Sequence, residues 1–294
     1  MIGAVELGLI YGVMALGVFL TFRVLNFPDL TVDGSFTTGA ATAAIAIASG
    51  WNPFLATACG FATGFIAGIV TGVLHTKGKI DGLLAGILTM IALWSINLRI
   101  MGGANVPLLR AQTVFSPLKD AKLLGTWVSV ALLIVVVVVA VAIVTWFLNT
   151  DVGLSIRATG DNGPMITSFG VSTDFTKTLT LGLSNGFVGM CGGLVAQYQG
   201  FADISMGIGL ILIGLASVIM GQAIVGTKRL WVAVIAVTFG AVLYRIIIFL
   251  ALSVGLNPND MRAVTAVLVI IALVVPRWKA MMSRSSAALV KKGT

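Results

Sequence analysis

Few side chains in this sequence are of a type that performs acid, base or nucleophilic chemistry. Charged residues make up 10% of the 294 residues, and there are one histidine and two cysteines. The sequence therefore predicts no catalytic residues, no metal site and no cofactor. Polar residues set among apolar ones are the remaining candidates for function. Those that we assign to a path through the molecule are Asn26, Asp29, Asp33, Asn185, Gln197, Gln199 and Arg245.

The sequence also lacks the loop that binds ATP phosphates, G-x-x-x-x-G-K-[ST]. Its nearest counterpart, Gly78-Lys79, is followed by Ile80, and Val73 stands where the first glycine belongs. The chain is therefore not expected to hydrolyse ATP itself. If it moves a solute, either a partner protein or an ion gradient supplies the energy.

Two carboxylates lie in a short polar stretch between the first two apolar segments. Asp29 and Asp33 follow Asn26, and Pro28 disfavours a regular helix here. Non-helical backbone at membrane depth is tolerated where it is buried in protein or lines water. Two interpretations follow: the carboxylates form a gate, or Asp33 only caps the helix expected to begin at residue 34.

The apolar segment at 178–198 is rich in glycine and in polar residues. Asn185 and Gln197 lie within it, and Gln199 directly follows it. Small residues let membrane helices approach closely, and polar side chains bond across such interfaces. Helix packing and the lining of a hydrated path are therefore alternative roles for these three residues.

Arg245 is the most deeply placed basic residue. It lies about nine residues from the end of its segment, or roughly 13 Å at about 1.5 Å per residue. Such a depth is too great for easy snorkelling, so the side chain is expected to face a partner or a wet cavity. It either meets the carboxylate of a solute or pairs with a carboxylate such as Glu6, and we favour the pair.

Composition places these residues in a membrane protein. The chain is 58% hydrophobic, and its 10% of charged residues compares with roughly 25% in soluble domains. Several runs reach the roughly 20 apolar residues that cross a bilayer as a helix. We expect an all-α polytopic fold, a single transmembrane domain over 1–294, with the first segment retained. The nine predicted crossings are 4–22, 34–49, 53–75, 82–101, 124–148, 178–198, 207–225, 230–254 and 262–276.

The net charge of +8 is interpreted as a topology signal rather than as a sign of nucleic-acid binding. With the N-terminus outside, 12 of the 18 Lys and Arg residues fall on the cytoplasmic side and four fall outside. Because basic residues accumulate in cytoplasmic loops, this orientation is predicted, with a cytoplasmic C-terminus.

The longest predicted cytoplasmic loop, 149–176, is too apolar for a disordered tether. Asn162 is suited to cap a short helix there. Met165, Ile166 and Phe169 would then lie on one side of that helix, as a patch that fits the groove of another protein. The alternative is a helix that packs on its own transmembrane bundle.

An internal similarity suggests two repeats. Residues 27–32 (FPDLTV) are matched by residues 201–206 (FADISM) at an offset of 174. The same offset lays segments one to four over segments six to nine, with repeat halves of about 1–123 and 175–294. Because an odd number of crossings separates the copies, the repeat would be inverted, as in many transporters. Chance similarity is the alternative.

Several of these stretches resemble the permeases of branched-chain amino-acid-type ABC importers. The signature is residues 157–162 (RATGDN) with the downstream Gly170-Val171. Residues 26–35 (NFPDLTVDGS), 196–203 (AQYQGFAD) and 214–217 (GLAS) resemble one subgroup, with a proposed tryptophan or tyrosine role. The resemblance covers nearly the whole chain. A departure lies at Gly163 and Pro164, where relatives carry polar helix formers.

The resemblance implies a non-enzymatic permease subunit of an ATP-driven importer for an amino acid or similar small solute in the bacterial inner membrane. Its implied partners are cytoplasmic ATP-binding subunits, an extracytoplasmic solute-binding protein and a second permease copy. The lipid bilayer surrounds it, and nucleic acid plays no part. The implied coupling residues are Arg157, Thr159, Gly160, Asp161, Asn162, Met165, Ile166, Phe169 and Gly170.

Two other functions remain open from the sequence. An ion-coupled secondary transporter agrees with the inverted repeat, but intramembrane carboxylates for proton or sodium coupling are scarce. A membrane scaffold without transport is the second alternative. Uptake driven by ATP, uptake driven by an ion gradient, and no uptake with any energy source distinguish the three.

Overall fold

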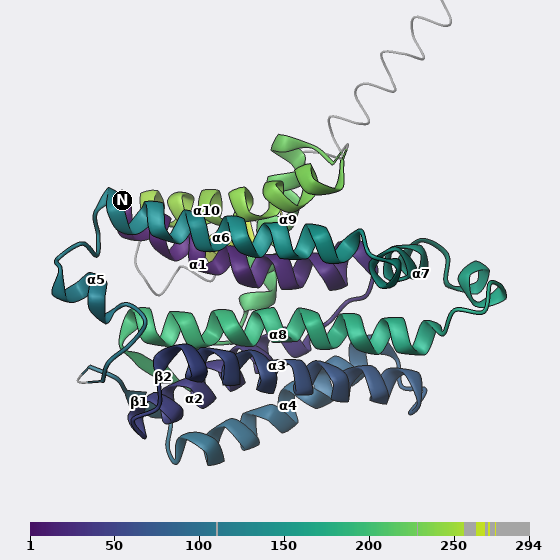
Figure 1. The fold of residues 1–294 in the computed structure, drawn as a ribbon, viewed down its shortest axis with the longest axis horizontal. Helices are drawn as coiled ribbons and strands as arrows, with labels where there is room; N and C mark the ends of the chain where they lie inside the picture. The colour runs from purple at the N-terminus through teal and green to yellow at the C-terminus, as the bar shows by residue number, and fades with distance from the viewer. Residues whose placement is uncertain (110, 228, 256–262, 268–269, 271–273, 275–294) are drawn as a thin grey trace, which may run out of the picture.

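The chain folds into a bundle of long helices with one small sheet (Figure 1). The computed structural model describes all residues except 110, 228, 256–262, 268–269, 271–273 and 275–294. In chain order the elements are α1 (Ile2–Phe19), the π-helical turn η1 (Leu20–Val24), α2 (Thr31–Ala48), α3 (Pro53–Thr76), α4 (Gly82–Met101), β1 (Asn105–Pro107), α5 (Ser116–Asp120), α6 (Trp127–Leu148), α7 (Asp151–Ser168), α8 (Thr173–Gln199), β2 (Phe201–Asp203), α9 (Leu210–Val225) and α10 (Leu230–Ser253).

Within the described residues, six helices are long and apolar enough to cross a membrane: α1 with η1, α3, α4, α6, α8 and α10. The predicted all-α polytopic fold is therefore confirmed. Helices also form at two further predicted segments. The segment predicted at 34–49 corresponds to α2, and the segment predicted at 207–225 corresponds to α9. The predicted segment 262–276 lies largely outside the described residues. The number of nine crossings stays a prediction.

The length of α6 matches a bilayer. Trp127 and Trp146 stand near its two ends, with 71% and 70% of their surface exposed. Trp146 follows Trp127 by 19 positions, which corresponds to about 28 Å at about 1.5 Å per residue, close to the roughly 30 Å of a hydrocarbon core. Tryptophan collects at the two membrane–water interfaces. The pair therefore marks where α6 enters and leaves the membrane.

The bundle has two unlike ends, which lie at the left and the right of Figure 1. At one end β1 pairs antiparallel with β2, so that Asn105 lies opposite Asp203. We call it the sheet end, and the N-terminus and α5 lie there as well. The opposite end carries α7, and we call it the α7 end. The loop predicted at 149–176 and the N-terminus are thus at opposite ends.

Glycines bring α2, α3 and α8 into close contact. A Cβ at Gly39 would lie 2.0 Å from the carbonyl oxygen of Gly189, and one at Gly64 would lie 2.2 Å from that of Asn185. Membrane helices gain nothing from burying apolar surface that lipid already covers, so they associate through such close packing. The glycines of α8 therefore serve helix packing.

Two of the helices, α2 and α9, begin inside the bundle rather than at its ends. Asp29, two residues before α2, is hydrogen-bonded to Asn185 near the middle of α8. The start of α9 is bonded to Asp33 in the first turn of α2. From there α2 runs to the sheet end and α9 to the α7 end. The non-helical link 25–30 therefore runs from the α7 end into the bundle, and the link 204–209 runs into it from the sheet end.

Candidate functional site

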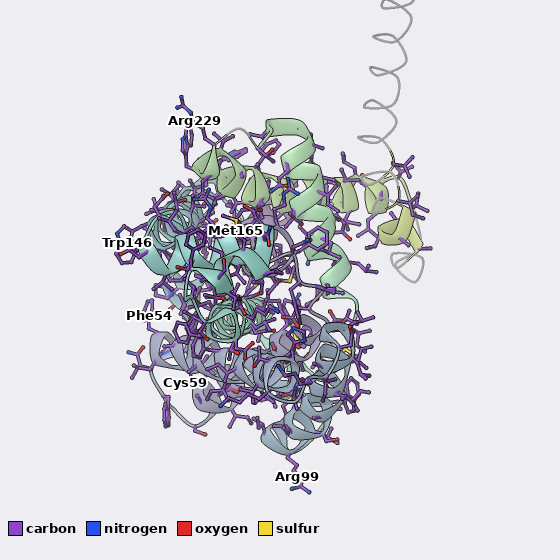
Figure 2. The ribbon with its side chains drawn as sticks, turned by 90° about the vertical axis from the view of Figure 1, so that its right-hand side faces the viewer. Phe54, Cys59, Arg99, Trp146, Met165 and Arg229 are labelled. Carbon is purple, nitrogen blue, oxygen red and sulfur yellow. The ribbon has the colours of Figure 1, made fainter. Side chains whose placement is uncertain are left out.

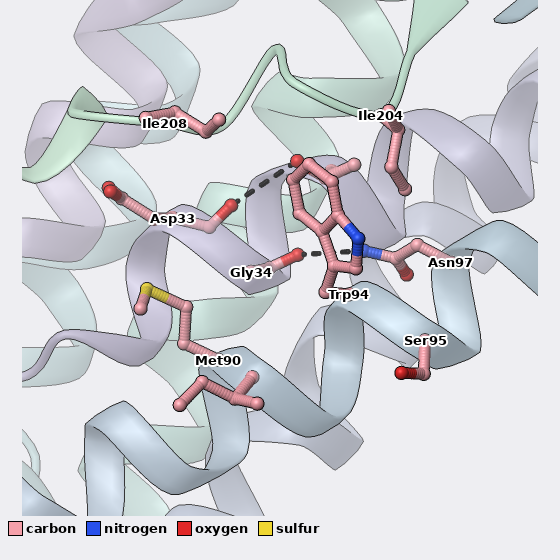
Figure 3. Close-up of a pocket in the computed structure, with 10 residues that line it drawn as sticks. Asp33, Gly34, Met90, Trp94, Ser95, Asn97, Ile204 and Ile208 are labelled. Atoms are coloured by element: carbon pink, nitrogen blue, oxygen red, sulfur yellow. Dashed lines mark hydrogen bonds between the residues drawn. The ribbon is translucent and has the colours of Figure 1, made fainter. Parts of the chain in front are cut away.

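A cavity of about 400 Å³ lies between α2, α4 and the link 204–209 (Figure 3). We call it the mid-bundle pocket. Asn97 on α4 is buried in its wall and donates to the carbonyl oxygen of Gly34, while its Oδ1 has no partner in the described part of the chain. The pocket thus offers a free acceptor among mostly apolar walls. Its lining residues are Asp33, Gly34, Thr37, Met90, Ile91, Trp94, Ser95, Asn97, Ile204 and Ile208.

Asp33, one of the predicted path residues, reaches this pocket but is already engaged. Its Oδ2 accepts from the backbone N–H of Gly209 at 2.7 Å, and its Oδ1 accepts from Ile211 at 2.8 Å. A carboxylate is favourable at a helix N-terminus because the first N–H groups there lack partners. Asp33 therefore caps α9. Of the two interpretations, the cap on its own segment is wrong, because the carboxylate accepts from the start of α9 instead, and the gate stays a prediction.

Asp29 and Asn185, both predicted path residues, are brought together. The Nδ2 of Asn185 donates to Asp29 Oδ2 at 2.7 Å, and the N–H of Thr31 donates to Asp29 Oδ1 at 2.9 Å. The hydroxyl of Thr31 continues the network to Thr71 at 2.8 Å, and Thr71 donates to Thr89 at 2.9 Å. This buried network ties α8, α2, α3 and α4 together. Its remaining free acceptor is the Oδ1 of Asn185.

The two copies of the repeated motif form the same local turn. The N–H of Thr31 donates to Asp29 at 2.9 Å, and the N–H of Ser205 donates to Asp203 at 2.8 Å. Hydrogen bonds from Ser205 also hold the pKa of the partly exposed Asp203 below its usual range. The first turn lies inside the bundle, whereas the second lies at the sheet end. The same turn in both copies gives the sequence similarity a structural counterpart.

The other polar residues of α8 divide by location. Gln197 is fully buried and donates to the hydroxyl of Thr57 at 2.8 Å, while its Oε1 accepts from the N–H of Val114 at 3.0 Å. Its side chain thus joins α8 to α3 and to the loop after β1. Gln199 is exposed at the sheet end. Asn26 is exposed as well and adopts a left-handed φ of 56°. None of these three residues lines the mid-bundle pocket.

Glu6 is a buried carboxylate, and from the sequence it was predicted only as a partner for Arg245. It is fully buried, and its oxygens accept from the N–H of Gly125 at 2.9 Å, the hydroxyl of Tyr198 at 2.7 Å and the hydroxyl of Ser129. It thereby joins α1, α8 and the start of α6. In the sequence, its position as the one acidic residue of the first apolar segment was the feature that could have indicated this role.

The favoured pair of Arg245 with Glu6 was wrong. The guanidinium carbon of Arg245 lies 3.8 Å from the centre of the Tyr11 ring, and its Nε is buried without a partner. Among the described residues, no ion pair joins it to Glu6. A cation over an aromatic face is stabilised, but it is not neutralised. Arg245 is therefore open to an anionic or hydrated partner.

At the opposite end from the sheet, α7 has the predicted capped helix. Asn162 breaks the helix with φ −155° and ψ 87°, and its Oδ1 accepts from the N–H of Met165 at 3.1 Å. Met165 and Phe169 are 52% and 70% exposed, and Ile166 is partly exposed. Gly163 and Pro164 do not prevent this turn. The predicted cap and apolar side are confirmed, whereas docking stays a prediction.

The rest of the coupling signature anchors α7 to the bundle. Thr159 is buried and bonds with the hydroxyl of Thr176 on α8 at 3.0 Å. A Cβ at Gly160 would lie 1.9 Å from the carbonyl oxygen of Val24, so only glycine fits against η1. Gly170, with φ 84°, ends the segment. Arg157 and Asp161 line a cavity nearby.

Among the described residues, no three His, Cys, Asp or Glu side chains gather in a way that could hold a metal ion. The polar groups inside the bundle are instead bonded to helix ends and to each other.

Comparison with known proteins identifies relatives over almost the whole chain. A family model described as branched-chain amino acid transport system / permease component matches residues 1–274. A tyrosine transport system permease protein of Clostridioides difficile (strain R20291) is 36% identical over 284 residues, covering 97% of this chain and 94% of that protein. An uncharacterized protein of Rickettsia prowazekii (strain Madrid E) is 31% identical over 277 residues, covering 93% and 96%. No solved structure matches significantly.

The similarity agrees with the structure at two levels. The family model covers every described span, and these spans are apolar helices of membrane-crossing length. The chain therefore belongs to the branched-chain amino acid transport permease family, the membrane components of ABC-type transport systems.

Proposed function

We propose that the chain is the permease subunit of an ATP-driven importer for an amino acid or a similar small solute. The observation that carries this proposal is the kinked helix of α7, whose Met165 and Phe169 project from the bundle. An exposed apolar helix is suited to a groove on a partner protein, here the ATP-binding subunit. ATP-driven closure of two such subunits would move α7 and change the access of the bundle.

The proposed setting is the bacterial inner membrane, with the N-terminus and the sheet end outside and the α7 end in the cytoplasm. The support is the bias of Lys and Arg, 12 against four. Nine crossings built as an inverted repeat are part of the proposal. They are supported by the turns that Asp29 and Asp203 share. The sheet end would then receive solute from an extracytoplasmic binding protein, and a second permease copy would complete the pore.

The proposed path passes the mid-bundle pocket. An ammonium group can donate to the free Oδ1 of Asn97 near the carboxylate of Asp33, and an apolar side chain can pack on Trp94. The relative from C. difficile is named for tyrosine transport, and an aromatic amino acid has these two parts. Arg245, which faces Tyr11 and has no acidic partner among the described residues, is the second polar group that we assign to the path.

Ion coupling is the alternative function, and it depends on carboxylates inside the bundle that could bind the coupling ion. The structure adds a buried carboxylate, Glu6, to Asp29 and Asp33. Each of the three, however, accepts hydrogen bonds from at least two donors that hold helix ends or loops. A carboxylate that binds and releases a coupling ion has to exchange such partners. These bonds therefore favour the ATP-driven importer.

The test is to replace Phe169 with Ala in the tagged full-length chain. Loss of a central apolar contact at a protein interface costs about 2 kcal/mol, so we expect roughly thirtyfold weaker association with the ATP-binding subunit. The measurement is co-purification from native membranes, followed by ATP-driven uptake in vesicles. Combined replacement of Asp161 and Asn162 with Ala should likewise uncouple transport in a folded bundle.

Phe54 is the matched control. It is also 70% exposed, but it begins α3 near the sheet end, so Phe54→Ala should leave the association unchanged. Equal loss in both variants would contradict docking through α7. Uptake that follows an ion gradient in the absence of any ATPase would favour the alternative function.

A further inference from the structure

A second cavity, of about 430 Å³, lies at the α7 end. We call it the basic pocket, because two guanidinium groups and one carboxylate line it. The lining side chains come from four elements and a loop: the α1–η1 helix, α7, α9, the loop after α9 and α10. They are Phe19, Arg23, Val24, Arg157, Asp161, Gln222, Thr227, Leu230 and Ala233.

The cationic groups of this pocket are not neutralised within the described part of the chain. No ion pair there engages Arg23 or Arg157, although Asp161 shares the cavity. The Nε2 of Gln222 is buried and has no hydrogen-bond partner among the residues that the structure describes. A buried donor without an acceptor is costly, and such a group calls for an acceptor from outside the chain. The pocket therefore presents donors in excess of acceptors.

The donors match one chemical class. A guanidinium group presents a planar fork of N–H donors that fits two oxygens of a phosphate. Two such groups, with the amide of Gln222 and the hydroxyl of Thr227, can surround an oxyanion. The single carboxylate, Asp161, can accept from a hydroxyl or an ammonium attached to that phosphate. We propose that the basic pocket binds the phosphate group of an anionic membrane lipid.

The position of the pocket favours a lipid headgroup over free phosphate. Trp146 lies near the end of α6 and Trp231 is the second residue of α10, and they are 70% and 49% exposed. Figure 2, viewed toward the α7 end, shows Trp146 projecting from the edge of the bundle. Exposed tryptophans mark the depth of lipid headgroups, and Leu230 of the pocket adjoins Trp231.

Apolar surface also continues from the pocket. Ile224 and Val225, at the end of α9, are 61% and 43% exposed, and they lie between Gln222 and Thr227 in the chain. Acyl chains can lie on such a surface while the phosphate enters the pocket, and basic pockets between membrane helices bind headgroups in this way. The site depends on the membrane location of the chain and not on its coupling to ATP.

The experiment measures lipid retention by the full-length chain. The purified protein is placed in nanodiscs of mixed phosphatidylglycerol and phosphatidylcholine, and retained lipid is counted by native mass spectrometry. Wild type should retain phosphatidylglycerol selectively. Arg23→Gln should weaken this retention about fivefold or more, because each basic contact to an anionic lipid surface contributes on the order of that factor. Gln222→Met, which preserves size, should weaken it less.

Arg229→Gln is the matched control. Arg229 is an exposed basic residue that directly precedes Leu230, projects from the bundle in Figure 2 and does not line the pocket. Retention within twofold of wild type is expected. Equal losses in Arg23→Gln and Arg229→Gln would overturn the proposal in favour of general surface charge. Monodisperse elution and an unchanged helical spectrum establish that each variant is folded.

A second experiment distinguishes a lipid headgroup from free inorganic phosphate as the ligand. Lipid-free protein in detergent is heated with inorganic phosphate or with chloride at equal ionic strength. A headgroup site predicts retention of phosphatidylglycerol that persists in phosphate buffer. Selective stabilisation by inorganic phosphate without any lipid preference would overturn the lipid assignment. Loss of bound lipid when the ATP-binding subunit docks would overturn it for the assembled transporter, because a partner group would then fill the pocket.

Discussion

At the scale of single residues, the buried polar groups mostly fix where helices begin. Asp29 and Asp33 hold the starts of α2 and α9, and Glu6 holds the loop that leads into α6. A carboxylate inside a membrane protein is costly unless donors surround it, and here backbone N–H groups at helix starts supply those donors. Polar residues predicted to line a path thus have structural roles that their residue type alone did not reveal.

Replacing Asp33 with Ala should destabilise the bundle, because the N–H groups of Gly209 and Ile211 would lose their acceptor. Loss of a helix cap costs about 1–2 kcal/mol, and Asp33→Asn should cost less because one carbonyl oxygen remains. Thermal unfolding in detergent measures the difference. Asp81→Ala is the control, since Asp81 caps α4 at an exposed position where water can replace it.

Gln197 and Gln199 offer a comparison at one end of α8. Gln197→Leu should cost about 1–3 kcal/mol, because it leaves the N–H of Val114 and the hydroxyl of Thr57 without their buried partner. Gln199→Leu changes an exposed side chain and should leave stability unchanged. Unfolding temperature and solute uptake are measured together. Loss of uptake in Gln197→Leu at unchanged stability would show a path role instead.

At the scale of elements, the position of α7 follows from its contact with η1. The chain passes so close at Gly160 that a side chain has no room, while Thr159 bonds to α8 on the same turn. Beyond this anchor, the kink at Asn162 turns the exposed helix away. A rigid anchor followed by an exposed apolar helix can transmit movement from a docked partner into the bundle.

Gly160→Ala should therefore displace α7. Its Cβ would lie 1.9 Å from the carbonyl oxygen of Val24, and such overpacking costs about 1–3 kcal/mol. We expect a lower unfolding temperature and weaker recovery of the ATP-binding subunit. Gly163→Ala is the control, because nothing lies within 4 Å of its Cβ position. Equal behaviour of the two variants would show that α7 does not depend on this contact.

At the scale of the whole molecule, the bundle is asymmetric. One end carries a small sheet that joins the two halves of the chain, since β1 follows α4 and β2 follows α8. The other carries α7 and the basic pocket. An importer needs such a difference, because solute arrives at one side and energy is supplied at the other.

Cysteine labelling tests this orientation. In a background with Cys59→Ala and Cys191→Ala, Gln112→Cys at the sheet end should react with a membrane-impermeant maleimide in intact spheroplasts. Ser168→Cys at the α7 end should react only after permeabilisation. Both positions are exposed, and α6 is the one span between them. The reverse pattern would invert the proposed orientation, and labelling from one side would show that α6 does not cross.

The sequence alone determined the membrane class, the bounds of most helices to within a few residues and the cap at Asn162. Each depends on local signals: an apolar run of bilayer length, or a capping residue next to the turn that it caps. Family resemblance likewise lay in short stretches such as residues 157–162.

Only the tertiary structure decided which partner each buried polar residue has. Asp33 caps a helix that begins 177 residues later in the chain, Glu6 bonds to Ser129 and Tyr198, and Arg245 stacks on Tyr11. The same packing starts α2 and α9 inside the bundle and forms both pockets. Contacts of this kind depend on how whole helices pack, and hydropathy measures how apolar a segment is but not which face meets which neighbour.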